Sequence, residues 1–299
     1  MSAPEPRLNH VTCASPAGLH RMAYWEWGDA TNARVLVCVH GLSRQGRDFD
    51  TLARDLSRDY RVVCPAVVGR GRSGWLLDPR LYAIPTYVSD MVTLVARLNV
   101  PEVHWVGTSM GGLIGLALAA QAGTPITRLV LNDVGPVIEP GFIPRVLGYL
   151  GVPAFWRTLE EAGDATWAIS RGFGPHTREQ WLELTRHQLV PTEQDDGHGG
   201  RVQGFKPHYD PAIAVPVRAG TPELAAAGEA LLWHLYDQIR CPTLLLRGAE
   251  SDLLSPATAA AMAGRGPRCQ VHELPGVGHA PTLVAADQRA VVRGFLLGP

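Results

Sequence analysis

The 299-residue sequence lacks several features that mark particular classes of protein. Its longest apolar stretch, around residues 111–120, is far shorter than the roughly 20 residues that a helix needs to cross a bilayer. The formal net charge is only −1, so nothing draws the chain electrostatically toward nucleic acid or an anionic membrane. The first ten residues contain no apolar signal core. We therefore expect a cytoplasmic protein that has neither a nucleic-acid nor a membrane partner.

Cysteine is also scarce, and the five cysteines form an odd set. Cys38, Cys64 and Cys241 fall inside strand-like segments, which predicts buried free thiols rather than a disulfide framework. No Cys-x-x-Cys or His-x-x-x-His spacing is present. The sequence therefore predicts neither a metal site nor another cofactor.

Apolar residues, by contrast, make up 46% of the chain and occur in short runs. Eight of these runs have the length and pattern of strands, and longer helical stretches separate them: residues 8–13, 21–27, 35–39, 61–64, 103–106, 127–131, 242–247 and 270–274. Such alternation is typical of α/β proteins with right-handed crossovers. We predict a mostly parallel eight-stranded sheet flanked by helices.

The alternation stops between residues 136 and 237, where aromatic-bearing helical pieces follow one another without a clear strand. This break predicts a helical cap at 136–237, inserted into a core made of residues 1–135 and 238–299. Within the cap, residues 191–200 are polar and rich in glycine, and we expect them to form a mobile loop.

The hexapeptide Gly-Thr-Ser-Met-Gly-Gly at 107–112 lies between an apolar strand and a helix rich in small residues. A tight strand-to-helix turn would raise Ser109 above its neighbours in a strained conformation, and Gly107 and Gly111 would let adjacent chain pass close by. The first N–H groups of the helix would meet negative charge developing at the serine. Ser109 is therefore the candidate nucleophile.

A nucleophilic serine needs a base and an acid that orients the base, and two later segments supply them. His279 lies on a loop rich in glycine and proline just after the strand 270–274. The apolar strand 242–247 is followed by Glu250 and Asp252. We favour Asp252 as the acid because its side chain is shorter and lies further along the loop. The order serine, acid, histidine is one of three known for this arrangement.

Two other residues could take these roles, and we interpret both as structural. Asp133 also follows an apolar strand and could in principle reach the same histidine, but we interpret it as a cap at the mouth of the site. His40 ends the strand 35–39 next to Gly41, where it is expected to brace its loop rather than to transfer protons.

Negative charge on the substrate oxygen would need hydrogen-bond donors. The backbone N–H of Leu42 lies at a sharp turn after a strand, and that of Met110 follows the nucleophile directly. Together they form the predicted oxyanion hole. Ser43 is a weaker candidate nucleophile because it lacks the strand-turn-helix setting.

These motifs follow one another in a familiar order: His40-Gly41, residues 67–73, residues 107–112, Asp252 and Gly278-His279. The chain resembles the α/β-hydrolase fold superfamily, and specifically its serine hydrolases with a helical cap, over nearly its whole length. Relatives that are epoxide hydrolases or haloalkane dehalogenases carry aspartate where this chain has Ser109, which argues against both chemistries. Many relatives have an acidic residue where this chain has Ala66, which leaves the bracing of that loop in question.

The resemblance and the motifs together predict a cofactor-free carboxylic ester hydrolase. Its expected substrates are small-molecule esters with small to medium apolar acyl groups, cleaved through an acyl-enzyme. The cap aromatics could line an acyl pocket, although aromatics at helical spacing more often belong to a core: Phe142, Phe155, Trp156, Trp167, Phe173 and Trp181.

Several alternatives remain open on the sequence alone. Related branches include lactonases, C–C bond hydrolases of ring-cleavage products and perhydrolases. Outside enzymes, the fold also hosts small-molecule receptors, because a fold does not fix a function. The oligomeric state is not indicated.

Overall fold

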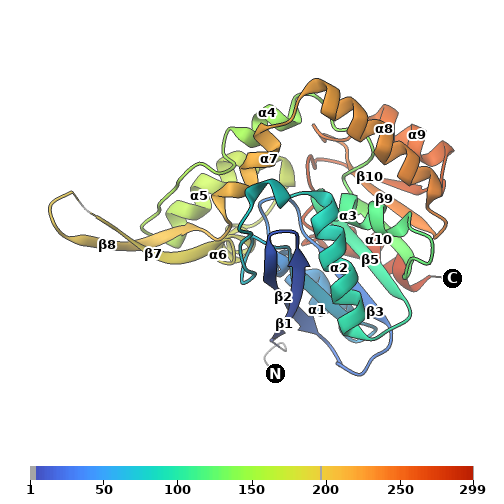
Figure 1. The fold of residues 1–299 in the computed structure, drawn as a ribbon, viewed down its shortest axis with the longest axis horizontal. Helices are drawn as coiled ribbons and strands as arrows, with labels where there is room; N and C mark the ends of the chain where they lie inside the picture. Colours follow the sequence, from blue (N-terminus) through green and yellow to red (C-terminus); the bar gives the residue numbers. More distant parts are fainter. Residues whose placement is uncertain (1–4, 196, 299) are drawn as a thin grey trace.

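The computed structural model describes residues 5–195 and 197–298 and has an α/β architecture (Figure 1). An eight-stranded sheet forms its centre, in the order β1-β2-β4-β3-β5-β6-β9-β10. Its strands are β1 (Arg7–Ser15), β2 (Gly18–Trp27), β3 (Val35–Val39), β4 (Arg61–Ala66), β5 (Val103–Thr108), β6 (Ile126–Asn132), β9 (Thr243–Gly248) and β10 (Gln270–Leu274). Strand β2 pairs antiparallel with β1 and β4, and the other neighbours are parallel. The predicted fold class and all eight predicted strands are confirmed.

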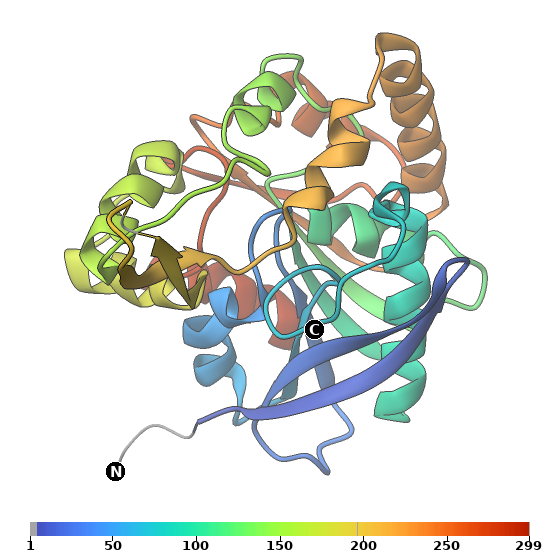
Figure 2. The same cartoon turned by 60° about the vertical axis from the view of Figure 1, so that its left-hand side comes forward.

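Helices cover both faces of this sheet because the central strands are apolar on both sides. Successive side chains of a strand point to opposite faces. In β3, Val37 therefore packs into the core beside α2 and α3, whereas Leu36 packs into the core beside α1 and α10. The helices concerned are α1 (Asp50–Leu56), α2 (Ile84–Leu98), α3 (Met110–Ala119), α9 (Pro256–Gly264) and α10 (Ala286–Leu297). The β1–β2 hairpin forms one edge of the sheet (blue in Figure 2).

The segment predicted as a cap leaves the sheet after β6. Its elements are α4 (Phe142–Leu147), α5 (Leu159–Ile169), α6 (Arg178–Arg186), β7 (Leu189–Asp195), β8 (Arg201–Pro207), α7 (Ala214–Arg218) and α8 (Pro222–Gln238). Among its described residues, none adds a strand to the central sheet. Helix α8 nevertheless packs against α3 of the core. The boundaries at 136 and 237 therefore stay a prediction.

The expectation of a loop at 191–200 is wrong for residues 191–195, which belong to β7. Residues 197–200 lie between the two strands, and residue 196 is outside the described residues. Strands β7 and β8 form an antiparallel hairpin that projects away from the body of the molecule (Figure 1). Its base is anchored by two backbone hydrogen bonds between Trp156 and Phe205, with N···O distances of 3.0 and 2.8 Å. The hairpin is largely polar and exposed on both faces, so it lacks the apolar alternation that reveals a half-buried strand.

Two predictions from composition can be compared with the structure. All five cysteines are free thiols, and Cys38 and Cys64 are buried in neighbouring strands of the core. Cys241, also predicted to be buried in a strand, is only half-buried and precedes β9. Burial raises the pKa of the Cys64 thiol well above its usual value. In the described part of the chain, no helix is both long and apolar enough to cross a membrane.

A buried histidine joins the cap to the core. The imidazole of His208, just after β8, accepts a hydrogen bond at Nδ1 from the backbone N–H of Gly71 (2.7 Å). Its Nε2 donates to the carbonyl oxygen of Ser43 (3.1 Å). The contact from Gly71 requires the neutral ring, because a protonated Nδ1 could not accept it, and burial lowers the pKa of His208 to about 3. The contact to Ser43 also fixes the loop that precedes Arg44.

This depressed pKa predicts a pH dependence of stability. Below about pH 6.5, histidine takes up a proton in the unfolded chain, whereas folded His208 stays neutral down to about 3. Acid therefore favours unfolding, by about 1.4 kcal/mol per pH unit for this one residue. We expect His208→Gln to reduce the slope of unfolding free energy against pH, between about pH 6 and 4, by roughly one proton. Urea denaturation at a series of pH values measures this slope.

The variant His234→Gln is the matched control, because His234 is exposed on α8. It should keep the wild-type slope. An unchanged slope in His208→Gln would show that His208 is not held neutral in the folded protein.

Candidate active site

Ser109 lies at the turn between β5 and α3, in the geometry that its motif predicts. Its backbone has φ 51° and ψ −118°, a strained conformation for a residue with a side chain. The neighbouring glycines make the turn possible. A Cβ on Gly107 would lie 2.2 Å from the carbonyl oxygen of Gly111, and a Cβ on Gly111 would lie 2.0 Å from that of Val39. Neither position has room for a side chain.

His279 approaches this serine from the loop after β10. Its Nε2 lies 3.0 Å from Ser109 Oγ, and its Nδ1 lies 2.8 Å from Asp133 Oδ2. An ionised carboxylate only accepts hydrogen bonds, so Nδ1 carries the proton and Nε2 is left to accept the serine proton. This arrangement can remove a proton from the serine hydroxyl and return it to a leaving group.

The carboxylate at His279 belongs to Asp133, and the predicted contact with Asp252 is wrong. Asp133 follows β6 directly, and its side chain is 0% exposed. Besides His279, its oxygens accept from the backbone N–H of Gly248 (2.8 Å) and from Ser251 Oγ (2.7 Å). These bonds satisfy a buried charge that would otherwise be costly. Asp133 is thus more than the loop cap that the sequence suggested.

Asp252 instead faces the cap. Its carboxylate accepts from Arg145 Nε (2.6 Å) and Nη2 (3.1 Å), and its side chain is 48% exposed. The loop after β9 does reach the site, but through Ser251, which turns inward while Asp252 turns outward. The order of strands in the sheet shows why Asp133, and not Asp252, lies beside His279. Strand β6 lies between β5 and β9, so Asp133 follows the strand next to the one that ends at Ser109.

The two backbone groups predicted to form an oxyanion hole are both available. In the described part of the chain, neither the N–H of Leu42 nor that of Met110 donates a hydrogen bond. Met110 is the first residue of α3. Gly41, next to Leu42, is so close to the nucleophile that a Cβ there would lie 3.6 Å from Ser109 Cβ. Developing negative charge near Ser109 could meet donors from two directions.

His40 braces the loop after β3 that contains Leu42, as the sequence suggested. Its Nδ1 donates to the Gly41 carbonyl (2.7 Å), and its Nε2 accepts from the backbone N–H of Val67 (2.9 Å). Complete burial lowers its pKa well below the usual histidine value. The ring is therefore a neutral structural link with no hydrogen bond to Ser109.

The loop after β4, left in question by Ala66, has a different brace. The hydroxyl of Ser73 donates to the Ala66 carbonyl (2.5 Å) and accepts from the backbone N–H of Ala23 (2.8 Å). The Ser73 hydroxyl thus braces this loop by bonding two backbone groups, although residue 66 has no acidic side chain.

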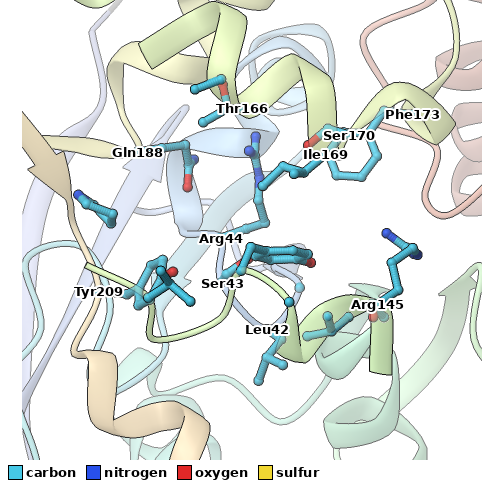
Figure 3. Close-up of a pocket in the computed structure, with 18 of the residues that line it drawn as sticks. Leu42, Ser43, Arg44, Arg145, Thr166, Ile169, Ser170, Phe173, Gln188 and Tyr209 are labelled. Atoms are coloured by element: carbon cyan, nitrogen blue, oxygen red, sulfur yellow. The ribbon is translucent and has the colours of Figure 1, made fainter. Parts of the chain in front are cut away.

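Ser109 and His279 line a cavity of about 310 Å³, whose wall is formed by core and cap residues. Figure 3 shows part of this wall, including Leu42 from the core and Phe173 from the cap. Of the six cap aromatics named from the sequence, three line the cavity: Phe142, Trp156 and Phe173. Tyr149 and Tyr209, which the sequence analysis did not single out, line it as well. Trp167 and Trp181 pack against each other instead, with ring centroids 4.9 Å apart. The wall is mostly apolar, but it includes the charged side chains of Arg44 and Arg145.

Two arginines line this cavity, each held by an aspartate. Arg44 bonds Asp48 through Nε (2.6 Å) and Nη2 (3.0 Å), and Asp48 also accepts from Gln188 Nε2 (2.6 Å). Burial raises the pKa of Asp48, and the Arg44 charge opposes that shift. Arg145 is the second arginine. In Figure 3 its guanidinium lies across the cavity from Gln188.

Outside the cavity, three side chains of metal-binding type meet in the N-terminal part of the core. Possible ligand atoms of Cys13, His20 and Asp90 lie within 4.8 Å of one another. His20 Nε2 already bonds both Asp90 oxygens (3.0 and 2.9 Å), and burial raises the pKa of Cys13 to about 12. This geometry fits a buried histidine–aspartate pair beside a protonated thiol.

Comparison with known proteins places the chain in a family. The model of the alpha/beta hydrolase family matches residues 36–293, and the chain belongs to that family. It is a hydrolase. The 3-hydroxybutyrate-oligomer hydrolase of Cupriavidus necator is 54% identical over 298 residues and is matched along 100% of both chains.

Solved structures agree. An alpha/beta hydrolase from Novosphingobium aromaticivorans superposes with a TM-score of 0.82 at 34% identity, covering 98% of each chain. A putative hydrolase from Rickettsia typhi has a TM-score of 0.84 at 28% identity and covers 97% of this chain and 98% of its own.

The position of the two aspartates leads to a direct test. Asp133→Asn should lower kcat by about 10⁴, because the amide no longer fixes the histidine tautomer or stabilises the imidazolium. Asp252→Asn should cost less than about 10-fold, because the aspartate touches Arg145 and not His279. Steady-state hydrolysis of p-nitrophenyl butyrate measures both, with circular dichroism to verify folding. A larger loss in Asp252→Asn would restore the assignment made from sequence.

Proposed function

We propose that the protein is a serine esterase that hydrolyses short oligomers of 3-hydroxybutyrate through an acyl-enzyme. The observation that carries the substrate class is the 54% identity, along the full length, with a 3-hydroxybutyrate-oligomer hydrolase. The Ser109–His279–Asp133 geometry supports the mechanism. We keep the cytoplasmic location as a prediction from sequence.

In the first half of the reaction, Ser109 Oγ attacks the ester carbonyl carbon while His279 Nε2 takes its proton. The carbonyl oxygen becomes an oxyanion, which the N–H groups of Leu42 and Met110 stabilise. His279 then protonates the departing alcohol oxygen as the C–O bond breaks. The acyl group stays on Ser109, and the alcohol half of the substrate leaves.

In the second half, water replaces the alcohol. His279 removes a proton from the water, which attacks the acyl carbon, and then returns the proton to Ser109 Oγ. Asp133 remains ionised throughout and holds the imidazole in place. The cavity of about 310 Å³ is at the lower end of volumes typical of small-molecule sites, about 300–1,000 Å³, which favours short oligomers.

The nucleophile can be tested by covalent labelling. A fluorophosphonate should add to Ser109, and peptide mass spectrometry locates the adduct. Ser109→Ala should lose on the order of 10⁶ in kcat, as expected when the nucleophile of such a set is removed. Ser43→Ala should still be labelled. An adduct on Ser43 in the wild-type protein would contradict the mechanism.

The substrate class needs its own experiment. The purified protein should release 3-hydroxybutyrate from the dimer and the trimer, measured by chromatography, and Ser109→Ala should release none above background. A panel of p-nitrophenyl esters of graded length, a lactone and a vinylogous diketone separates the other hydrolase branches. Preferential turnover of the lactone or the diketone would replace the proposal, and binding without turnover would indicate a receptor.

A further inference from the structure

We propose that Arg145 binds the free carboxylate of the substrate, one 3-hydroxybutyrate unit beyond the scissile ester. The protein would then remove single units from the carboxyl end of an oligomer. This inference rests on the proposed function and adds a direction to it. It follows from where the leaving group must lie, and from which cavity arginine is exposed enough to bind a second carboxylate.

The leaving group must lie beside His279, because His279 Nε2 has to protonate the departing oxygen. The ring of Phe142, at the start of α4, packs edge-on against the His279 ring, with centroids 4.8 Å apart. Arg145 follows three residues later on the same helix, and its guanidinium carbon lies 5.0 Å from the centre of the Phe142 ring. From His279, the cavity wall therefore continues along α4 to Arg145.

The separation between the His279 ring and the Arg145 guanidinium suits one monomer unit. The two contacts to Phe142 keep the guanidinium carbon within about 10 Å of the centre of the His279 ring. In a 3-hydroxybutyrate leaving group, three covalent bonds separate the ester oxygen from the carboxyl carbon, a span of about 4 Å. Hydrogen bonds of about 2.8 Å at each end, to the imidazole and to the guanidinium, complete the bridge.

Arg145 also has unused donors. Its Nε and Nη2 bond Asp252, whereas Nη1 has no hydrogen-bond partner among the described residues. A guanidinium carries five N–H donors in a rigid fork, so its Nη1–Nη2 end can bind a second carboxylate while Asp252 holds the other edge. The side chain is 39% exposed and lines the cavity. Asp252 thus orients the guanidinium without occupying it.

The other cavity arginine suits a carboxylate poorly. Like Arg145, Arg44 bonds its aspartate through Nε and Nη2, but its side chain is only 14% exposed. The Asp48 carboxylate that holds it is half-buried and also accepts a hydrogen bond from Gln188. Beside it, the buried Oε1 of Gln188 has no hydrogen-bond partner. Because Nε2 of this amide donates to Asp48, Oε1 is fixed as an acceptor. The hydroxyl at the end of a neutral chain can donate a hydrogen bond to an acceptor at this end, whereas an ionised carboxylate has no proton to donate.

The chemistry of the oligomer matches this asymmetry. Every 3-hydroxybutyrate oligomer has its free carboxylate on the alcohol side of each ester bond and its free hydroxyl on the acyl side. Placing the alcohol half along α4 brings the carboxylate to Arg145. The acyl half then points toward the Arg44–Gln188 end. Only one orientation satisfies both ends of the cavity.

The test compares the dimer with its terminal carboxamide, which is neutral and nearly the same shape. We expect Arg145→Met to lower kcat/KM for the acid about 10- to 100-fold, as for the loss of a charge-assisted contact. The carboxamide should lose less than about 3-fold. Arg145→Lys should retain part of the preference for the acid, since it keeps the charge without the fork. Chromatography of the released unit measures each rate, and thermal melts verify folding.

Arg178→Met is the matched control, because Arg178 forms a similar exposed pair with Asp164 on the cap, outside the cavity. It should keep the wild-type ratio of acid to carboxamide. Equal losses on both substrates in Arg145→Met, or a wild-type protein with no preference for the acid, would overturn the inference. If the wild type cleaves p-nitrophenyl butyrate but neither dimer, the proposed substrate class fails instead.

A second readout tests the direction of attack. With a trimer labelled isotopically in its carboxyl-terminal unit, the first monomer released by the wild type should carry the label. First release of unlabelled monomer would overturn the inference while leaving oligomer hydrolysis intact.

Discussion

The buried carboxylate of Asp133 fixes the geometry on which the rest of the site depends. A charge without solvent must be fully hydrogen-bonded, and its partners come from two segments. Gly248 and Ser251 lie at and just after the end of β9, and His279 follows β10. One side chain thus aligns the carboxyl ends of neighbouring parallel strands. The same bonds set the tautomer of the imidazole that faces Ser109.

This constraint also shapes the cap side of the cavity. Because Ser251 turns inward to Asp133, the next residue, Asp252, turns outward and meets Arg145 on α4. Two adjacent residues of one loop therefore contact different parts of the site: Ser251 bonds Asp133, and Asp252 bonds Arg145. The orientation of Arg145 depends on the loop that completes the hydrogen bonding of Asp133.

Backbone strain at Ser109 persists because its surroundings leave no alternative. A non-glycine residue at such angles costs of order 1–3 kcal/mol. Close contacts of Gly107 with Gly111, and of Gly111 with β3, hold the turn against the sheet. The hydrogen bond from Ser109 N–H to the Asn132 carbonyl (3.0 Å) joins it to the end of β6, one residue before Asp133. Nucleophile and acid are thereby positioned by adjacent strands.

Local sequence predicts the strands and the serine turn well, because both depend on short-range pattern: apolar runs, and glycines where backbones nearly touch. The acid is different, since Asp133 and Asp252 each follow an apolar strand and look alike locally. Only the spatial order β5-β6-β9 separates them, and that order is a property of the whole sheet. The β7–β8 hairpin escapes prediction for the opposite reason. Its pairing is made by backbone hydrogen bonds, which polar, exposed side chains do not reveal.

The cap and the core contribute different groups to the site. Core loops supply His279 and Asp133 beside Ser109, and hydrogen bonds among these side chains hold them in place. The cap supplies Phe142 against the His279 ring and Arg145 one turn further on. Because both belong to α4, a displacement of this helix would change the packing of the base and the position of the guanidinium together. In the proposed mechanism, substrate selection and proton transfer would therefore be coupled through the six residues of α4.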